Sequence, residues 1–546
     1  METHDVGRSG SEYVLDALAV EGVKTLFGVI GEGNAHLLDA TNDRTLRFEQ
    51  ARHEQAAVSM ADGYARTART VGVCTLTHGP GVTNGATGIA AADRDDVPLV
   101  VIVGDTGIDG RETSLQYLDH RTFAEPITVY RTRIERPSTI PEILARAFDR
   151  ARTRSGPVLV ELPIDVQRAG APTTTYEPIP RRGQRPRPDD QRLSESIALL
   201  DAANRPVLLA GGGTRRSGAG EALATLAERL GAPIATTYFG RGVLPDTHPL
   251  VSGIAGTFMT PANDELLWDV DVVVAVGATL SGKTSRYGEL YADADVIRID
   301  VDPDAIGVHR RPTVGVVADA RAALEALAAR VDPDPERAAW VTETIAGAPT
   351  VPVTEFESSD GEVDPREFTL ELSKRVPGDA IIAVDSGNNT GFPALFHEVG
   401  DGGEMLVNGN FGTMGYALPA ALGAKRAAPD RTVVCYTGDG AFVQVIQELE
   451  TGVRVGLPVI VAVLNDRSYG IIRHRQRREY GRETASRFDG PDFVEVAEGF
   501  GAMAAVVRSR DDISIVDEYL ESDPTVPLVL DARTNPEVTR PGFPPY

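Results

Sequence analysis

Short apolar runs of strand length alternate with helix-like segments along almost the whole chain. This alternation is typical of parallel β-sheets, in which a helix must cross back over the sheet before the next strand can pair. With 546 residues, the chain is too long for one hydrophobic core, so the pattern predicts several doubly wound α/β domains. The longest apolar runs, such as VPLVVIV and LPVIVAVL, are far shorter than a membrane span, and the N-terminal residues contain no apolar signal core. We therefore expect a cytoplasmic protein that does not bind membranes.

Two stretches interrupt the alternation. Residues 171–190 are rich in proline, threonine and arginine, and residues 332–364 are rich in proline and acidic residues. Both compositions are typical of linkers. They divide the chain into three predicted parallel-sheet domains, at 1–170, 191–331 and 365–546.

The charge balance limits the kinds of partner. The net charge is -25, and only four of the 54 basic residues are lysine. A dispersed acidic surface with few lysines is typical of a halophilic protein kept soluble in a salty cytosol. It argues against nucleic acid as a partner, because no basic stripe is present to neutralise phosphates. Cys74 and Cys435 lie in strand-like runs without metal-ligand spacing, which predicts reduced, buried thiols.

One carboxylate stands at the end of an apolar strand. In VVCYTGDGAF (433–442), Asp439 lies between two glycines, and a buried charge there is costly without a partner. The following residues predict a helix, a turn and a second buried strand that ends in Asn465 and Asp466. Because the carboxyl ends of parallel strands face a common crevice, Asp439 and Asp466 should lie together. Two oxygen ligands beside a helix start predict Mg²⁺ holding a diphosphate.

This arrangement resembles the cofactor motif of thiamine-diphosphate enzymes, in which GDG is followed by a crossover helix and a strand that ends in two asparagines. Here Asp466 takes the second asparagine position and keeps an oxygen ligand. The resemblance implies that Mg²⁺ is bound by the side chains of Asp439 and Asp466 and by the carbonyl of Ser468. It also implies a set of contacts to the cofactor around the diphosphate: Asn388, Asn389, Gly438, Gly440, Ala441, Tyr469, Gly470 and Ile471.

A predicted helix of small residues carries the candidate acid for the other end of the cofactor. ARHEQAAVSMADGYART (51–67) contains Glu54, which taken alone is more typical of a solvated surface acid. The stretch resembles the family's catalytic helix, whose glutamate hydrogen-bonds the aminopyrimidine ring and so assists removal of the thiazolium C2 proton. The resemblance therefore implies that Glu54 is catalytic.

Two further segments extend the resemblance. THGPGVTN (77–84) is similar to the family's loop beside the pyrimidine ring, which implies contacts from Pro80 and Asn84. NFGTMGYALPAALGAK is similar to the segment that supports the bent cofactor, which implies Gly412 and Met414. A plain core methionine is the alternative for Met414.

Several residues are candidates for contact with the substrate. Gln116, in LQYLDH, matches the family's glutamine beside the substrate, and Ile472 matches an apolar wall residue. Ile30 lies in FGVIGEGNAHLLDA, which resembles the loop before the first family helix. His78 replaces a small residue in the pyrimidine loop, where an imidazole could donate a proton. A structural histidine in a polar loop is an equal alternative for His78.

The sequence also departs from the acetolactate synthase pattern. Arg475 stands where these synthases usually carry a tryptophan, and TLSGKTSRY (279–287) replaces the RFDDR stretch of the flavin-binding central domain. These differences argue against FAD and against a role in branched-chain amino acid biosynthesis. Arg473, Arg475 and Arg477 belong to a basic run that predicts either a solvated face or subunit contact, or a clamp for an acidic substrate.

The resemblance implies thiamine-diphosphate- and Mg²⁺-dependent decarboxylation of a 2-oxo acid, with pyruvate as the expected substrate, followed by carboligation as in acetolactate synthase. The alternative within the family is a decarboxylase without ligation, of the benzoylformate or sulfopyruvate kind. A nicotinamide-linked oxidoreductase using Gly211–Gly213 lacks an acidic ribose partner at the expected spacing. A cofactor-free binding protein would be expected to have lost Glu54 or the metal carboxylates.

The family's cofactor lies between two subunits. The resemblance therefore implies a homodimer or homotetramer, and it leaves room for a small regulatory subunit.

Overall fold

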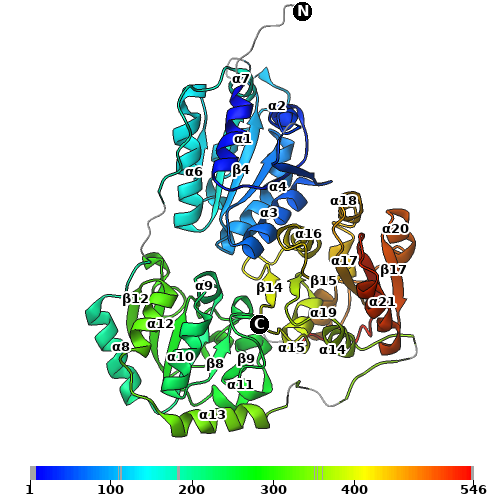
Figure 1. Ribbon diagram of the computed structural model, residues 1–546. Coiled ribbons are helices and arrows are strands. Elements are labelled where there is room, and N and C mark those ends of the chain that lie inside the picture. The colour runs from blue at the N-terminus through cyan, green and yellow to red at the C-terminus, as the bar shows by residue number, and fades with distance from the viewer. Residues whose placement is uncertain are drawn as a thin grey trace, which may run out of the picture.

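The computed structural model describes residues 8–42, 44–107, 110, 113–180, 185–349, 351–352, 355–359 and 361–542. These residues form three α/β lobes, which follow one another along the chain from the blue N-terminal lobe to the red C-terminal one (Figure 1). The outermost residues of the first and third predicted domains, 1–7 and 543–546, lie outside the described residues.

Within the described residues, each lobe contains one six-stranded parallel sheet. The strand orders are β2-β1-β3-β4-β6-β5, β12-β11-β10-β7-β8-β9 and β14-β13-β15-β16-β18-β17. The strands are β1 Thr25–Gly28, β2 Arg47–Gln50, β3 Gly72–Leu76, β4 Leu99–Asp105, β5 Tyr130–Arg133, β6 Pro157–Pro163, β7 Pro206–Ala210, β8 Ile234–Thr236, β9 Val251–Ile254, β10 Val272–Val276, β11 Asp295–Asp300, β12 Val314–Val317, β13 Ile381–Val384, β14 Glu404–Val407, β15 Val433–Gly438, β16 Ile460–Asn465, β17 Met503–Val507 and β18 Leu528–Arg533.

The predicted fold class is confirmed, and its physical origin is visible in the central strands. Strands such as β4 and β10 are buried along their whole length, because helices cover both faces of each sheet. The first and third sheets share one order of strands. In each, the chain first adds a strand on one side of its first strand and then continues on the other side, so the strand order reverses between β1 and β3 and between β13 and β15. A crevice for ligands is expected at the carboxyl ends of the strands at such a reversal.

Helices cover the faces of the sheets (Figure 1). The α-helices are α1 Gly10–Val20, α2 Ala35–Asp39, α3 Glu54–Ala68, α4 Pro80–Arg94, α5 His120–Phe123, α6 Ile140–Arg154, α7 Ile164–Arg168, α8 Asp190–Ala202, α9 Gly212–Arg216, α10 Gly220–Leu230, α11 Pro261–Leu266, α12 Ala320–Ala328, α13 Pro335–Gly347, α14 Pro365–Arg375, α15 Gly391–Phe396, α16 Ala417–Ala427, α17 Asp439–Phe442, α18 Glu448–Arg454, α19 Gly470–Tyr480, α20 Phe493–Gly499 and α21 Ile515–Glu521. Among the described residues, no helix combines the length and the apolar character needed to cross a membrane.

Helices α3 and α16 pack directly against each other and join the first lobe to the third (Figure 1). A β-carbon on Gly63 of α3 would lie 2.1 Å from the carbonyl oxygen of Ala420, and one on Gly423 of α16 would lie 2.0 Å from that of Met60. The two backbones therefore touch at positions where only glycine fits. This contact fixes how the two lobes sit within one chain.

Two segments differ from the expectations. The helix expected directly after Gly440 is interrupted, because α17 ends at Phe442 and α18 begins only at Glu448. The second predicted linker contains α13, which packs on the central domain and buries Val341. Its proline and acidic residues serve as a helix start, since Asp334 accepts the N–H of Arg337 and Pro335 is the first helical residue.

Cys74 and Cys435 are buried free thiols, as predicted.

A buried glutamate lies where α18 meets the first lobe. Glu448 is fully buried, and its carboxylate accepts the backbone N–H of Arg52 at 3.0 Å and the hydroxyl of Thr451 at 2.8 Å. Burial raises the pKa of Glu448 to about 7. Between the ordinary glutamate pKa and about pH 7, the Glu448 side chain is protonated in the folded protein but ionised in the unfolded chain. The contribution of this group to the free energy of unfolding therefore falls as the pH rises through that window.

We expect Glu448→Gln to stabilise the protein by about 2 kcal/mol at pH 8 and by much less at pH 5. The amide removes the buried charge, and it can still accept from Arg52 and donate to Thr451. Thermal unfolding at the two pH values measures the effect. Glu450→Gln is the matched control, because hydrogen bonding to Arg52 lowers the pKa of Glu450 and its removal should give no gain at pH 8. Equal melting temperatures for wild type and Glu448→Gln at pH 8 would contradict the prediction.

Candidate active site

Two carboxylates meet at the carboxyl edge of the third sheet. Asp439 follows β15 and is 2% exposed, while Asp466 follows β16 and is half-buried. One oxygen of Asp439, Oδ1, accepts the N–H of Gly440 at 2.8 Å, whereas Oδ2 is buried with no hydrogen-bond partner among the described residues. Burial and then the charge of Asp466 raise the pKa of Asp439, and burial raises the pKa of Asp466. A cation bound between two such carboxylates would lower the cost of their buried charge.

The chain turns sharply after Asp466. The backbone N–H and the hydroxyl of Ser468 donate to Asp466 Oδ1 at 3.0 and 2.9 Å. A β-carbon on Gly470 would lie 2.4 Å from Asp466 Oδ2 and 3.1 Å from Asn388 Cβ, so α19 begins at a position that requires glycine. The first residues of α19 therefore lie against the carboxylate pair.

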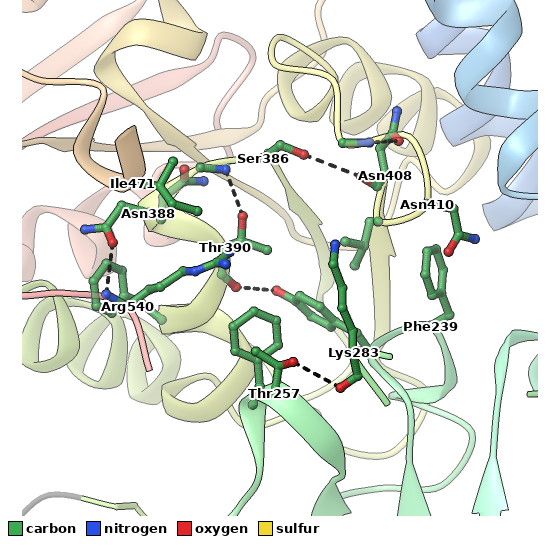
Figure 2. Close-up of a pocket in the computed structure, with 18 of the residues that line it drawn as sticks. Phe239, Thr257, Lys283, Ser386, Asn388, Thr390, Asn408, Asn410, Ile471 and Arg540 are labelled. Carbon is green, nitrogen blue, oxygen red and sulfur yellow. Dashed lines mark hydrogen bonds between the residues drawn. The ribbon is translucent and has the colours of Figure 1, made fainter. Parts of the chain in front are cut away.

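The carboxylates line a cavity of about 680 Å³ between the third and central lobes, to whose lining the first lobe adds Asp95 and Asp96. Figure 2 shows Asn388 and Ile471 at one side of this cavity and Asn408 and Asn410 at the other. The predicted site residues that line it are Asn388, Asn389, Gly412, Met414, Gly438, Asp439, Gly440, Asp466, Ser468, Tyr469, Gly470, Ile471 and Ile472. Ala441 is not part of this lining and lies buried in α17.

The two asparagines after β13 brace the loop that leads into α15. Asn388 donates from Nδ2 to the carbonyl of Val538 at 3.2 Å and accepts the N–H of Arg540 at 2.9 Å (Figure 2). Asn389 donates from Nδ2 to the carbonyl of Asp385 at 3.0 Å. Both side chains thus hold backbone in place at the cavity wall.

Asp385 positions the methionine segment, and the sequence interpretation did not single it out. It is 1% exposed and accepts the backbone N–H groups of Gly415 and Tyr416 at 3.2 and 3.3 Å, and the hydroxyl of Thr437 at 3.1 Å. Burial raises the pKa of Asp385 to about 6. These bonds fix the backbone next to Met414. The only signal in the sequence was its place directly after a buried strand.

The central lobe supplies the opposite wall. Thr257, Lys283 and Phe239 line the cavity, and the Lys283 side chain extends from its loop into the space facing Asn408 (Figure 2).

The glycine turn at Gly211–Gly213 in the central lobe has a packing explanation, since a β-carbon on Gly211 would lie 2.0 Å from the carbonyl oxygen of Gly277. The glycines of this turn thus allow a close approach of two backbones.

The first-lobe candidates form a separate group. Glu54 begins α3, and Asn84 donates from Nδ2 to its Oε2 at 3.0 Å. Pro80 begins α4, and Gln116 lies against the preceding turn. The described lining of the cavity contains none of the first-lobe candidates, which are Ile30, Glu54, His78, Pro80, Asn84 and Gln116. Within one chain, Gln55 rather than Glu54 reaches the methionine segment, with a 3.4 Å bond from its Nε2 to the carbonyl of Met414.

His78 is 2% exposed, and burial lowers its pKa. Its imidazole is therefore uncharged at neutral pH, so any proton it supplies there comes from a neutral N–H group. Ile30 is exposed and lies two residues after the end of β1.

The basic run on α19 is held by acidic side chains. Arg473 is fully buried and pairs with Glu483 at 3.0 Å and with Glu537. Arg475 pairs with Glu479 at 2.8 Å, and it is not part of the cavity lining. Most of the positive charge is thus neutralised within the helix and its surroundings.

Comparison with known proteins agrees with this geometry. Three thiamine pyrophosphate enzyme families match the chain: the N-terminal TPP binding domain at residues 8–125, the central domain at 193–327 and the C-terminal TPP binding domain at 385–531.

The full-length similarities are to acetolactate synthases. The chain is 34% identical to a probable acetolactate synthase large subunit of Methanocaldococcus jannaschii, covering 98% of this chain and 93% of that protein. It is also 34% identical to the acetolactate synthase large subunit of Corynebacterium glutamicum, over 96% and 86% of the two chains. The identity to the acetolactate synthase isozyme 3 large subunit of Escherichia coli is 34%, over 94% and 92%. The chain therefore belongs to the thiamine pyrophosphate enzymes, in the family of the acetolactate synthase large subunits.

Proposed function

We propose that the protein is a catalytic subunit that uses thiamine diphosphate and Mg²⁺ to decarboxylate pyruvate and join the product to a second 2-oxo acid. The single observation that carries the proposal is the buried Asp439 Oδ2, which lacks a hydrogen-bond partner among the described residues at the edge of a cavity that Asp466 also lines. The relatives' names supply the expected activity. FAD is not part of the proposal.

The donor set fits the cofactor. Asp439, Asp466 and the Ser468 carbonyl would hold Mg²⁺, since hard oxygen ligands and shared phosphates suit this ion. Cavity-lining residues around the starts of α17 and α19 would surround the diphosphate: Asn388, Asn389, Gly438, Gly440, Tyr469, Gly470 and Ile471. Ala441, the remaining predicted contact, follows Gly440 outside this lining. Bound thiamine diphosphate supplies the electron sink that lets a 2-oxo acid lose CO2.

The chain's own residues would then bind, orient and exclude water. Asp385 holds the backbone beside Met414, so the methionine and Gly412 would form a fixed support under the cofactor. Asn84 orients the Glu54 carboxylate, which would hold a proton at the pyrimidine side. Gln116, Ile30 and Ile472 would contact the substrate. Apolar cavity residues such as Phe239 would limit access of water.

The site is proposed to form between two copies of the chain. The first-lobe candidates are separate from the cavity within one chain, and exposed apolar side chains lie near both groups. On the first lobe these are Ile30, Leu115 and Tyr117, and on the third lobe they are Phe411, Val443, Tyr469 and Ile472. Exposed apolar side chains gathered at two incomplete half-sites favour self-association into a homodimer or homotetramer.

Mixing two inactive variants tests this assembly. A Glu54→Gln subunit and an Asp439→Asn subunit each lack one half, but their heterodimer keeps one complete site. Co-refolding or co-expression at equal amounts should restore about a quarter of wild-type activity, because about half of random dimers are mixed and each has one working site of two. The separate variants mixed without subunit exchange are the control. No recovery in verified mixed dimers would contradict a site shared between subunits.

The activity itself is tested by the product formed from pyruvate. The purified protein is incubated with thiamine diphosphate and Mg²⁺ in high-KCl buffer, which suits the proposed halophilic, cytoplasmic character. We expect acetolactate. Acetaldehyde would overturn the proposed ligation and favour a non-ligating decarboxylase that acts on pyruvate. No turnover of pyruvate would overturn the proposed substrate and favour an enzyme for another 2-oxo acid. Addition of a candidate small regulatory subunit is a second arm, because the relatives are named as large subunits.

The division into domains at 1–170, 191–331 and 365–546 is part of the proposal, with α13 (Pro335–Gly347) added to the central domain on which it packs. Limited proteolysis should cut within the segments that separate these domains, where the chain crosses between lobes.

A further inference from the structure

A buried chain of charged and polar side chains runs through the first lobe behind the turn at residues 77–80. Asp105 ends β4, Glu161 lies in β6, and His120 begins α5, and each is at most 1% exposed. Arg133 of β5 pairs with Asp105 and lies 3.4 Å from Glu161 Oε2. Three such ligands could suggest a metal site, but the Arg133 guanidinium already supplies the positive charge between the two carboxylates.

The two hydrogen bonds of His120 define which nitrogen carries the proton. Its Nε2 accepts the backbone N–H of Gly79 at 2.9 Å, and its Nδ1 lies 3.1 Å from Glu161 Oε1. A backbone N–H can only donate, so Nε2 must carry the free lone pair. Nδ1 therefore carries the proton and donates it to the Glu161 carboxylate. The imidazole that bridges Glu161 and Gly79 is neutral.

Gly79 is the point at which this chain meets the predicted active-site residues. It is buried and has φ +59, and a β-carbon there would lie 2.4 Å from the carbonyl oxygen of Gln116. The next residue, Pro80, begins α4, and Asn84 in the first turns of that helix donates to Glu54 at 3.0 Å. Holding the Gly79 amide thus fixes both the backbone that packs on Gln116 and the helix start that orients Glu54.

We infer that His120 is a positioning residue, which holds the 77–80 turn so that Gln116 and the Asn84–Glu54 pair face the pyrimidine side of the cofactor site. This inference rests on the proposed function for its catalytic consequence, but its structural part does not. His120 contacts no substrate, because it is fully buried behind the turn. The proton stays on Nδ1, which leaves the lone pair of Nε2 free to accept the Gly79 N–H, and it takes no part in the reaction.

Two neutral amide substitutions at His120 separate the positioning role from a general structural one. In His120→Gln, the longer side chain places its amide near the position of Nε2, where the oxygen can still accept from Gly79. In His120→Asn, the shorter side chain places its amide near the position of Nδ1, where it can bond Glu161 but cannot reach Gly79. Each variant therefore keeps one of the two hydrogen bonds of His120: glutamine keeps the bond to Gly79, and asparagine keeps the bond to Glu161.

Hydrogen–deuterium exchange without cofactor is the first measurement. We expect slow exchange of the Gly79 amide in the wild type, faster exchange confined to residues 77–84 in His120→Asn, and wild-type exchange in His120→Gln. Unprotected Gly79 in the wild type would overturn the inference even if His120→Asn does not fold. Unchanged exchange in His120→Asn, or faster exchange throughout the first lobe in both variants, would also overturn it.

Kinetics form the second measurement. We expect His120→Asn to lower kcat about 10- to 100-fold with little change in the affinity for thiamine diphosphate, and His120→Gln to recover most of the loss. Equal losses in both variants would overturn the positioning role. If the wild-type protein forms no acetolactate, the proposed reaction fails, while the exchange experiment still decides whether His120 holds the turn.

Discussion

Replacement of Asp439 by asparagine is expected to weaken binding of thiamine diphosphate in the presence of Mg²⁺ by about 100-fold or more. One oxygen of Asp439 accepts the Gly440 N–H, and the other is buried without a hydrogen-bond partner in the described part of the chain. An asparagine has a single oxygen, so it cannot satisfy Gly440 and a metal ion as the carboxylate can. Titration of the purified variant with thiamine diphosphate at fixed Mg²⁺ measures the change.

The same substitution should not destabilise the cofactor-free protein, because it removes a buried charge for which the described residues supply no cation. Its melting temperature without Mg²⁺ and cofactor should equal or exceed that of the wild type. Asp466→Asn is the matched control, since the family pattern carries an amide oxygen at this position, and its affinity should stay within about 10-fold of the wild type. A wild-type titration curve for Asp439→Asn would contradict the assignment of the metal site.

Replacement of Glu54 by glutamine is expected to lower kcat by about 100- to 10,000-fold, the usual contribution of a positioned acid–base group. The glutamine oxygen can still accept from Asn84, so the fold and the helix start should be unchanged. The affinity for thiamine diphosphate should change little, because the proposed diphosphate contacts lie in the third lobe. Steady-state kinetics on pyruvate, with a parallel cofactor titration, measures both quantities.

The control for Glu54→Gln is Glu142→Gln, which removes a surface acid of the same lobe that pairs with Arg146. This control should keep wild-type kcat and a similar melting temperature. Full activity in a folded Glu54→Gln protein would remove the proposed acid–base role of this residue.

The strand-end carboxylates illustrate what local sequence predicts well. Asp439 and Asp466 each follow a short, mostly apolar and buried strand, and parallel sheet geometry brings such positions to one edge. The structure places both in the lining of one cavity, together with most of the predicted diphosphate residues. Likewise, the small residues around Glu54 predicted a helix that packs closely, and the α3–α16 contact has that character.

Asp385, Glu448 and His120 illustrate what local sequence does not predict. The partners that give each of them a role include Tyr416, Arg52 and Gly79, which lie 31, 396 and 41 residues away in the chain. No periodicity or spacing signals such bonds, because they form only after separate elements have packed. The break between α17 and α18 was not predicted either, since helical periodicity continues through residues 443–447, where the backbone forms tight turns with bonds such as Val445 N–H to the carbonyl of Phe442.

By itself, the sequence determined the three α/β lobes, the strand ends that carry the carboxylates and the helix that carries Glu54. Each of these follows from interactions between near neighbours in the chain and from the fixed geometry of parallel sheets. Only the tertiary structure decided that Asp439 Oδ2 has no partner in the described protein, that Glu54 is absent from the cavity lining within one chain, and that Arg473 is neutralised by Glu483 and Glu537. Burial and charge pairing depend on which distant segments pack together, and the free energy of an ionised side chain is set by that packing.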